Sequence, residues 1–171
     1  MDTLGPILAD LRDAARATIA RCRGEEALPG LVSLQPGNTV SWDNCCEGGG
    51  TLWVRVVSAD ARPAGAQPCD ITHLSVRAAL GAVRCVHVVD EDGTFPTAEE
   101  MDGDTLATTG DADLLLRTLR EWEPAGALAK FRVPKSLTIE NGLPQGPQGG
   151  CAGWEWTFTF GLMLGVTADG C

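Results

Sequence analysis

Long apolar segments are missing from this sequence. No run of about 18 apolar residues without charges occurs, and a membrane-spanning helix needs roughly that length. The first residues, Met1-Asp2-Thr3, are acidic, whereas a secretion signal begins with a basic segment. We therefore expect a soluble protein that is made and assembled in a cytoplasm and has no membrane partner.

Basic residues are also few. The 13 Lys and Arg against 23 Asp and Glu give a net charge of −10, which argues against tight nucleic-acid binding because such binding requires cations that neutralise phosphates. The acidic surplus is concentrated in one stretch, and for most of its members a solvated surface is the simplest interpretation. Its members are Asp90, Glu91, Asp92, Glu99, Glu100, Asp102, Asp104, Asp111 and Asp113.

Motifs that bind cofactors or perform catalysis are not found. Neither a G-x-x-x-x-G-K-[ST] motif nor a strand-bound G-x-G-x-x-G motif occurs, so the glycines at 48–50 and 146–153 indicate loops. The segment 90–93 lacks the oxygen spacing of a calcium loop and indicates an acidic turn. Glu99 and Glu100 are typical of an ordinary helix N-terminus. We predict no catalytic residue, no cofactor and no enzyme activity.

The seven cysteines are odd in number and include no C-x-x-C pair, so a full disulfide framework is not expected and free thiols are predicted in the newly made protein. Cys85 lies in an apolar run and is expected to pack as a small hydrophobe. A zinc site from Cys45, Cys46, Cys69 and a histidine would need four converging ligands, and adjacent cysteines seldom point at one metal. We therefore predict no metal site. Oxidation is conceivable for the cysteines in Gly-rich or terminal segments, which are Cys45, Cys46, Cys151 and Cys171.

A Cys85–His87 nucleophile pair can also be drawn from the sequence. Residues two apart on a strand point the same way, but the spacing implies no carboxylate that would orient the imidazole. A packed thiol beside a partly exposed imidazole is the stronger interpretation.

The length of 171 residues and the 44% hydrophobic content suit a single domain over 1–171. Helical spacing of apolar residues predicts a helix over 3–23, and Gly24 would end it. Residues 24–50 are interpreted mostly as loop. Alternation predicts a strand over 51–58, a loop over 59–68, and strand structure over 71–89 with a bulge at Gly81.

A capping-box arrangement of Thr97 and Glu100 begins a second helix that runs to about Trp122, as one helix or as two pieces with a break near Thr109. A short strand is predicted over 137–141 and a long one over 154–164. The long strand carries an aromatic stripe, Trp154, Trp156, Phe158 and Phe160, which should lie beneath the helices. The predicted fold is α+β, with a small antiparallel or mixed sheet and two main helices packed on one face.

Three segments resemble a known family. SWDNCCEGGGTLWVRVVS at 41–58, HLSVRAALGAVRCVHVVDEDGTFPTAEEM at 73–101 and GPQGGCAGWEWTFTF at 146–160 are similar to tail terminator and head-to-tail connector proteins of long-tailed phages that infect actinobacteria. The order of predicted elements also resembles that of tail terminators. The resemblance rests on pattern and composition over roughly a third of the chain, and it carries over no catalytic residue.

The resemblance implies a virion protein at the head-tail junction. It would form a ring, commonly of six copies, that caps the tail tube and contacts the tube protein and the head-tail stopper or connector protein. DNA would pass through the lumen without specific binding. Six copies would carry 6 × −10, or −60, and any of this charge that lines the bore would repel DNA.

Ring contacts are expected from outward side chains of the strands and from one loop. The candidates are Trp42, Cys45, Cys46, Trp53, Arg55 and Arg77, although burial within one subunit is equally consistent for Trp42 and Trp53. Alternatives are another head-tail connector, such as a stopper or adaptor, and a minor tail protein. A small hydrolase with a carboxylate or thiol in a cleft is a further alternative from a different class.

Overall fold

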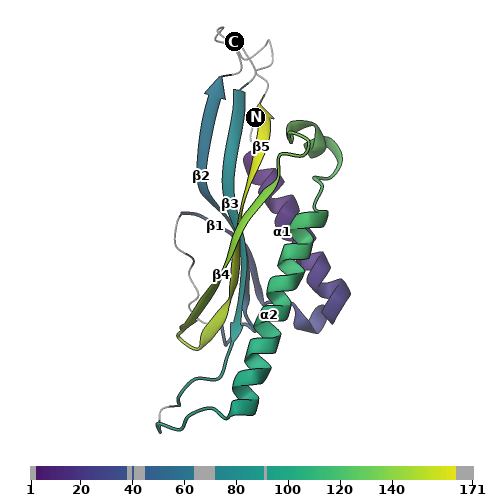
Figure 1. Cartoon of the computed structure of the whole chain (residues 1–171). Helices are drawn as coiled ribbons and strands as arrows, with labels where there is room; N and C mark the ends of the chain where they lie inside the picture. The colour runs from purple at the N-terminus through teal and green to yellow at the C-terminus, as the bar shows by residue number, and fades with distance from the viewer. Residues whose placement is uncertain (1–2, 38–39, 41–44, 64–71, 91, 165–171) are drawn as a thin grey trace.

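The structure, a computed structural model, describes residues 3–37, 40, 45–63, 72–90 and 92–164. The strands form one five-stranded sheet, and Figure 1 shows both long helices on one of its faces. The predicted α+β fold is confirmed. The elements in chain order are α1 (Leu4–Arg23), η1 (Glu25–Ala27), β1 (Leu31–Gln35), β2 (Thr51–Pro63), β3 (Thr72–Cys85), α2 (Ala98–Glu121), η2 (Gly126–Phe131), β4 (Thr138–Gln148) and β5 (Cys151–Leu164).

The sheet is mixed, with the strand order β1-β2-β3-β5-β4. β1 runs parallel to β2, and the other three neighbouring pairs are antiparallel. The short β1 and the long β4 are therefore the two edge strands. In the described ranges, no helix combines the length and the apolar character that a membrane crossing requires.

The main core lies between the helices and one face of the sheet. The predicted aromatic stripe contributes Phe158 and Phe160, which are fully buried and stacked at 5.9 Å between ring centroids. Trp156 is partly buried against the same core, and its indole N–H donates to the carbonyl oxygen of Ala112 in α2 at 2.9 Å. Trp154 is partly exposed. Phe158, Phe160 and Trp156 thus lie in the core beneath the helices as predicted, whereas Trp154 is not among the residues of that core.

Both helices begin and end where their sequence signals indicate. α1 is followed by Gly24 at φ +92°, and α2 begins with a capping box in which Thr97 and Glu100 bond each other reciprocally. The break considered near Thr109 does not occur, because α2 is continuous. Thr108 and Asp111 are buried on either side of Gly110, so tertiary packing offsets the low helix propensity of glycine.

Several strand predictions were wrong. Residues 31–35 form β1 rather than loop, and β2 extends to Pro63 where a loop was expected. β3 is one strand whose pairing with β2 is regular across Gly81, and the irregularity lies instead in β2 between Val56 and Ser58. β4 continues from the predicted short strand to Gln148. In each case the segment has a neighbouring strand to pair with, and such pairing is not visible in local composition.

A buried charge network joins the helices to the sheet. The carboxylate of Asp111 in α2 is 2% exposed and is paired with Arg84 of β3 and with Arg23 of α1, the latter at 2.8 Å. Arg84 also donates to the carbonyl oxygen of Ala27 at 2.9 Å. Because the charge of Asp111 is compensated on two sides, it can be buried, and it fixes α2 over the end of β3 that carries the cysteines.

Candidate functional site

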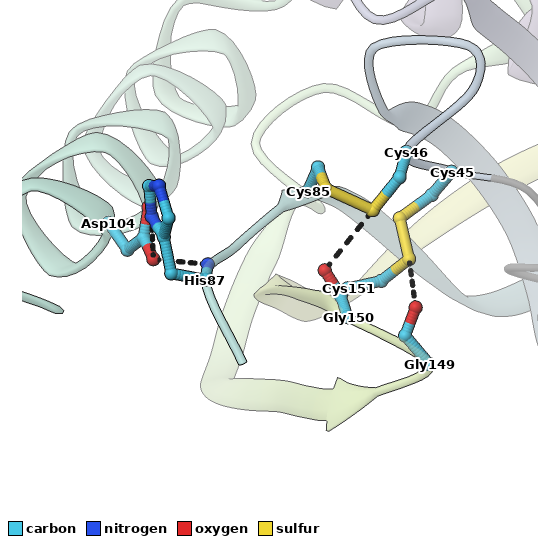
Figure 2. The surroundings of a disulfide bond; sticks show 8 residues. All are labelled: Cys45, Cys46, Cys85, His87, Asp104, Gly149, Gly150 and Cys151. Atoms are coloured by element: carbon cyan, nitrogen blue, oxygen red, sulfur yellow. Dashed lines mark hydrogen bonds and ion pairs between the residues drawn. A yellow bond between two sulfur atoms is a disulfide. The ribbon is translucent and has the colours of Figure 1, made fainter. Parts of the chain in front are cut away.

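Four cysteines from three separate segments meet at one end of the sheet (Figure 2). Cys85 ends β3 and Cys151 begins β5, and the two residues are opposite each other in the antiparallel pairing. Cys45 and Cys46 lie in the turn before β2. They form the disulfides Cys45–Cys151 and Cys46–Cys85, with Cα–Cα distances of 6.3 Å and 4.6 Å. We call these four residues the cysteine cluster.

The cysteine cluster contradicts two predictions made from the sequence. Free thiols were expected, yet of the described cysteines only Cys22, exposed on α1, is unpaired. Cys85 was expected to pack as a small hydrophobe, but it is exposed and bonded to Cys46. The missing signal was long-range: sequence separations of 106 and 39 residues become short distances only when β2 and β5 both pair with β3.

The two disulfides differ in exposure. Cys45 and Cys151 are each 2% exposed, whereas Cys46 and Cys85 are exposed. Solvent reductants therefore have access to Cys46–Cys85 first. The Sγ atom of Cys46 lies 3.4 Å from the carbonyl oxygen of Gly150 (Figure 2).

The turn that carries the two adjacent cysteines is fixed by backbone contacts. The N–H of Gly50 donates to the carbonyl oxygen of Cys45 at 2.7 Å, and the N–H of Leu31 donates to Gly50 at 3.3 Å. Gly50 has φ +112°, and a Cβ there would lie 2.5 Å from the carbonyl oxygen of Val83. Glycine is therefore required at this position, and the turn is held close against β3.

Beneath the turn, the helix-free face of the sheet has a second, small core. Trp53 is fully buried there with Val83, Cys45 and Cys151. Its ring covers Gly81, where a Cβ would lie 2.3 Å from the indole Cζ2. The glycine that was expected to mark a bulge instead makes room for the indole.

A carboxylate on this face accepts hydrogen bonds from the indole and from a neighbouring arginine. Glu155 is 8% exposed and accepts from Trp53 Nε1 at 2.8 Å, from Arg55 Nε at 2.9 Å and from Arg55 Nη2 at 2.7 Å. The hydrogen bond to Glu155 raises the pKa of Arg55 above its ordinary value. Trp53 and Arg55 were candidate ring contacts, but both are hydrogen-bonded to Glu155 within the subunit. Trp53 is fully buried and therefore cannot contact a neighbouring copy.

The remaining ring-contact candidates have different positions. Arg77 is exposed on the helix-free face and donates to Glu140 at 2.7 Å. A hydrogen bond from the Thr159 hydroxyl, followed by the Arg77 contact, holds the pKa of Glu140 below its ordinary value. Cys45 is buried, Cys46 is exposed in a disulfide, and Trp42 lies outside the described residues. Arg77 and Cys46 thus remain accessible to a neighbour.

An imidazole–carboxylate pair lies beside the cysteine cluster. His87 Nδ1 is 3.1 Å from Asp104 Oδ2, and the main-chain N–H of His87 donates to the same oxygen at 2.7 Å. The pair borders a shallow cleft of about 280 Å³ between the start of α2 and the β4–β5 turn. No local pattern in the sequence indicated this orienting carboxylate. Cys85 is held in a disulfide, however, so the Cys85–His87 nucleophile pair is not formed.

The acidic turn was interpreted correctly for its described residues. The carboxylate of Asp90 accepts from the main-chain N–H groups of Asp92 and Thr94 at 3.1 Å and 2.8 Å. This side chain closes its own turn.

No protein-family model and no curated protein matches the chain in sequence.

Proposed function

We propose that this chain is a ring-forming structural protein of the head-tail joint of a long-tailed phage. About six copies would cap the tail tube and contact the head connector while DNA passes through. The location in the particle rests on the family resemblance of the three segments at 41–58, 73–101 and 146–160. The structural observation that supports self-assembly is a sheet with two different edge strands, β1 and β4, neither of which has a further strand beside it among the described residues.

Each edge strand presents exposed apolar side chains. β1 carries Leu31 and Leu34, which are 49% and 37% exposed, and β4 carries Leu143, which is 52% exposed. A cyclic ring requires two unlike patches, because each copy must offer one patch to each neighbour. The two edges lie at opposite ends of the strand order and meet this requirement.

Strand directions also suit such a joint. Following the pairings across the sheet, β1, β2 and β5 run one way while β3 and β4 run the other. When the sheet of one copy continues into the next, β1 therefore meets β4 in an antiparallel sense. Pro144 and Pro147 lack an N–H, so pairing would be confined to Thr138–Leu143. This segment is offset from β1, and closure of a sheet into a barrel requires such a stagger.

The positions of the charged side chains indicate which part of the proposed ring would be acidic. The helix-free face carries compensated pairs, Arg55 with Glu155 and Arg77 with Glu140. The described acidic residues between 90 and 113 lie instead on α2 and on the segment before it, which projects beyond the sheet in Figure 1. A bore lined by the sheet would be close to neutral in these residues. DNA repulsion would then act at the rim, where α2 begins.

A mixing experiment tests whether the two edges meet. Leu34→Lys places a charge on the β1 edge and Leu143→Lys places one on the β4 edge, so each variant alone should give monomers by native mass spectrometry. Mixed together, they retain one compatible joint and should form a heterodimer. Leu106→Lys is the matched control, because Leu106 is 73% exposed on α2 and its replacement should leave the ring intact.

Electron microscopy with tail-tube subunits tests the location. We expect rings of the chain at one end of the tubes. Dimers of each single variant alone would indicate a symmetric contact and contradict the ring. A wild-type chain that stays monomeric both alone and with tubes would refute the proposal.

A further inference from the structure

The cysteine cluster has the composition and convergence of a thiolate metal site. The Sγ atoms of Cys45, Cys46 and Cys151 all lie within 4.8 Å of one another, and the Sγ atom of Cys85 is bonded to that of Cys46. Four sulfur atoms therefore occupy one small volume. We propose that the reduced chain binds one zinc ion, or a similar soft divalent metal, through these four thiolates.

The required geometry is close to the one observed. A Zn–S bond of about 2.3 Å in a tetrahedron places the sulfur atoms about 3.8 Å apart. The Sγ atom of Cys46 is already near this separation from those of Cys45 and Cys151, within 4.8 Å, whereas Cys85 is placed at the cluster by its bond to Cys46. Sulfur atoms of the same disulfide must separate by about 1.7 Å from a bond of about 2.05 Å, and rotation of the cysteine side chains can supply this movement.

The backbone holds the four ligands from two sides. Cys85 and Cys151 are register partners on neighbouring strands of the sheet. Cys45 and Cys46 lie in the turn that the Gly50 N–H closes over Trp53. Adjacent cysteines on an extended strand would point to opposite faces, but this turn brings both sulfur atoms into one group. The turn therefore removes the objection that the sequence raised against a metal site with adjacent cysteines.

Metal binding and disulfide formation exclude each other. Two equivalents of a dithiol reductant supply four electrons and four protons to the two disulfides, which gives four protein thiols and oxidises each reductant molecule to a disulfide. Binding of Zn²⁺ then releases up to four protons as the thiolates coordinate the metal. Reduction can begin at Cys46–Cys85, because this disulfide is exposed.

Cobalt titration tests the site in a chain that retains only these four cysteines. In the Cys22→Ser, Cys69→Ser, Cys171→Ser background, the protein is reduced with a phosphine, freed of the reductant under anaerobic conditions and titrated with Co²⁺. We expect one equivalent to bind, with the intense visible bands of tetrahedral cobalt and thiolate-to-cobalt charge transfer in the near ultraviolet. Zn²⁺ should displace the cobalt, and the oxidised chain should bind none.

Two further variants keep the test decisive. Adding Cys151→Ser or Cys85→Ser should weaken metal binding at least about tenfold. If the reduced chain unfolds, binding is scored by zinc-dependent recovery of the helical circular dichroism signal. The proposal is overturned if the reduced chain binds no stoichiometric cobalt and zinc restores no structure, or if loss of Cys151 or Cys85 leaves binding unchanged.

Discussion

Replacing Gly81 by alanine tests the packing of Trp53 on the helix-free face. The added Cβ would lie 2.3 Å from the indole Cζ2 and 2.5 Å from Cε2, well inside van der Waals contact. Trp53 is fully buried beneath the cysteine turn, and its N–H is bonded to Glu155, so the ring cannot move without losing contacts. Overpacking of this kind costs about 1–3 kcal/mol, and we expect Gly81→Ala to lower the free energy of unfolding by about 2 kcal/mol.

Guanidinium denaturation followed by circular dichroism measures this change. The matched control is Gly103→Ala in α2, where a Cβ meets nothing within 4 Å and should stabilise the helix by about 0.5–1 kcal/mol. In a Trp53→Leu background, the cost of Gly81→Ala should fall by at least about 1 kcal/mol, because the clashing ring is gone. A Gly81→Ala chain as stable as the wild type, or the same cost in both backgrounds, would show that the indole does not lie on Gly81.

Three more substitutions test the Asp111 charge network, the Thr97 cap of α2 and the Cys45–Cys151 disulfide. Asp111→Asn leaves two arginines uncompensated and should cost about 3–5 kcal/mol in denaturation, whereas exposed Asp113→Asn should change stability by less than about 0.5 kcal/mol; equal effects would contradict the buried network. Thr97→Ala should cost about 1 kcal/mol through loss of the cap. Hydrogen bonds from the Thr97 main-chain N–H and then from its hydroxyl hold the pKa of Glu100 below 4.5, so their contribution is present above pH 4.5 and is lost as pH falls through the lower folded value. Thr97→Ala removes only the hydroxyl, so the stability difference between wild type and variant should narrow there to the part that comes from the Glu100 N–H bond, and a difference independent of pH would argue against the capping box. Without reductant, Cys151→Ser should cost about 4 kcal/mol by the chain-entropy argument and should raise the free-thiol count by one, because Cys45 loses its partner. An unchanged midpoint together with a free-thiol count that falls by one would exclude the Cys45–Cys151 bond.

The charge pairs of the helix-free face bear on the proposed ring. Glu155 reaches across β3 to Arg55, and Glu140 contacts both Arg77 and Thr159. Because these polar groups are satisfied within one subunit, the face can remain in water without a partner. The exposed leucines of β1 and β4 are different, since apolar edge residues gain from contact with a neighbour. The edges are therefore the surfaces on which assembly variants should be made first.

The sequence by itself determined the elements whose signals are local. Apolar residues at helical spacing and the Thr97–Glu100 capping box defined the two helices, and the alternation from Trp154 to Leu164 defined the strand that passes beneath them. These patterns depend on neighbours a few residues away, and they survive in the fold because packing reinforces them.

Only the tertiary structure decided which distant residues meet. Leu31–Gln35 is a strand because β2 lies beside it. Position 81 requires glycine because the Trp53 ring leaves no room for a Cβ atom there, and not because the strand bulges. The cysteines meet because the pairing of β3 with β5 sets Cys85 opposite Cys151 and the pairing of β2 with β3 brings the Cys45–Cys46 turn to the same end of the sheet. Strand pairing and side-chain packing bring residues that are far apart in the chain into contact. No local pattern of charge, size or spacing specifies these contacts.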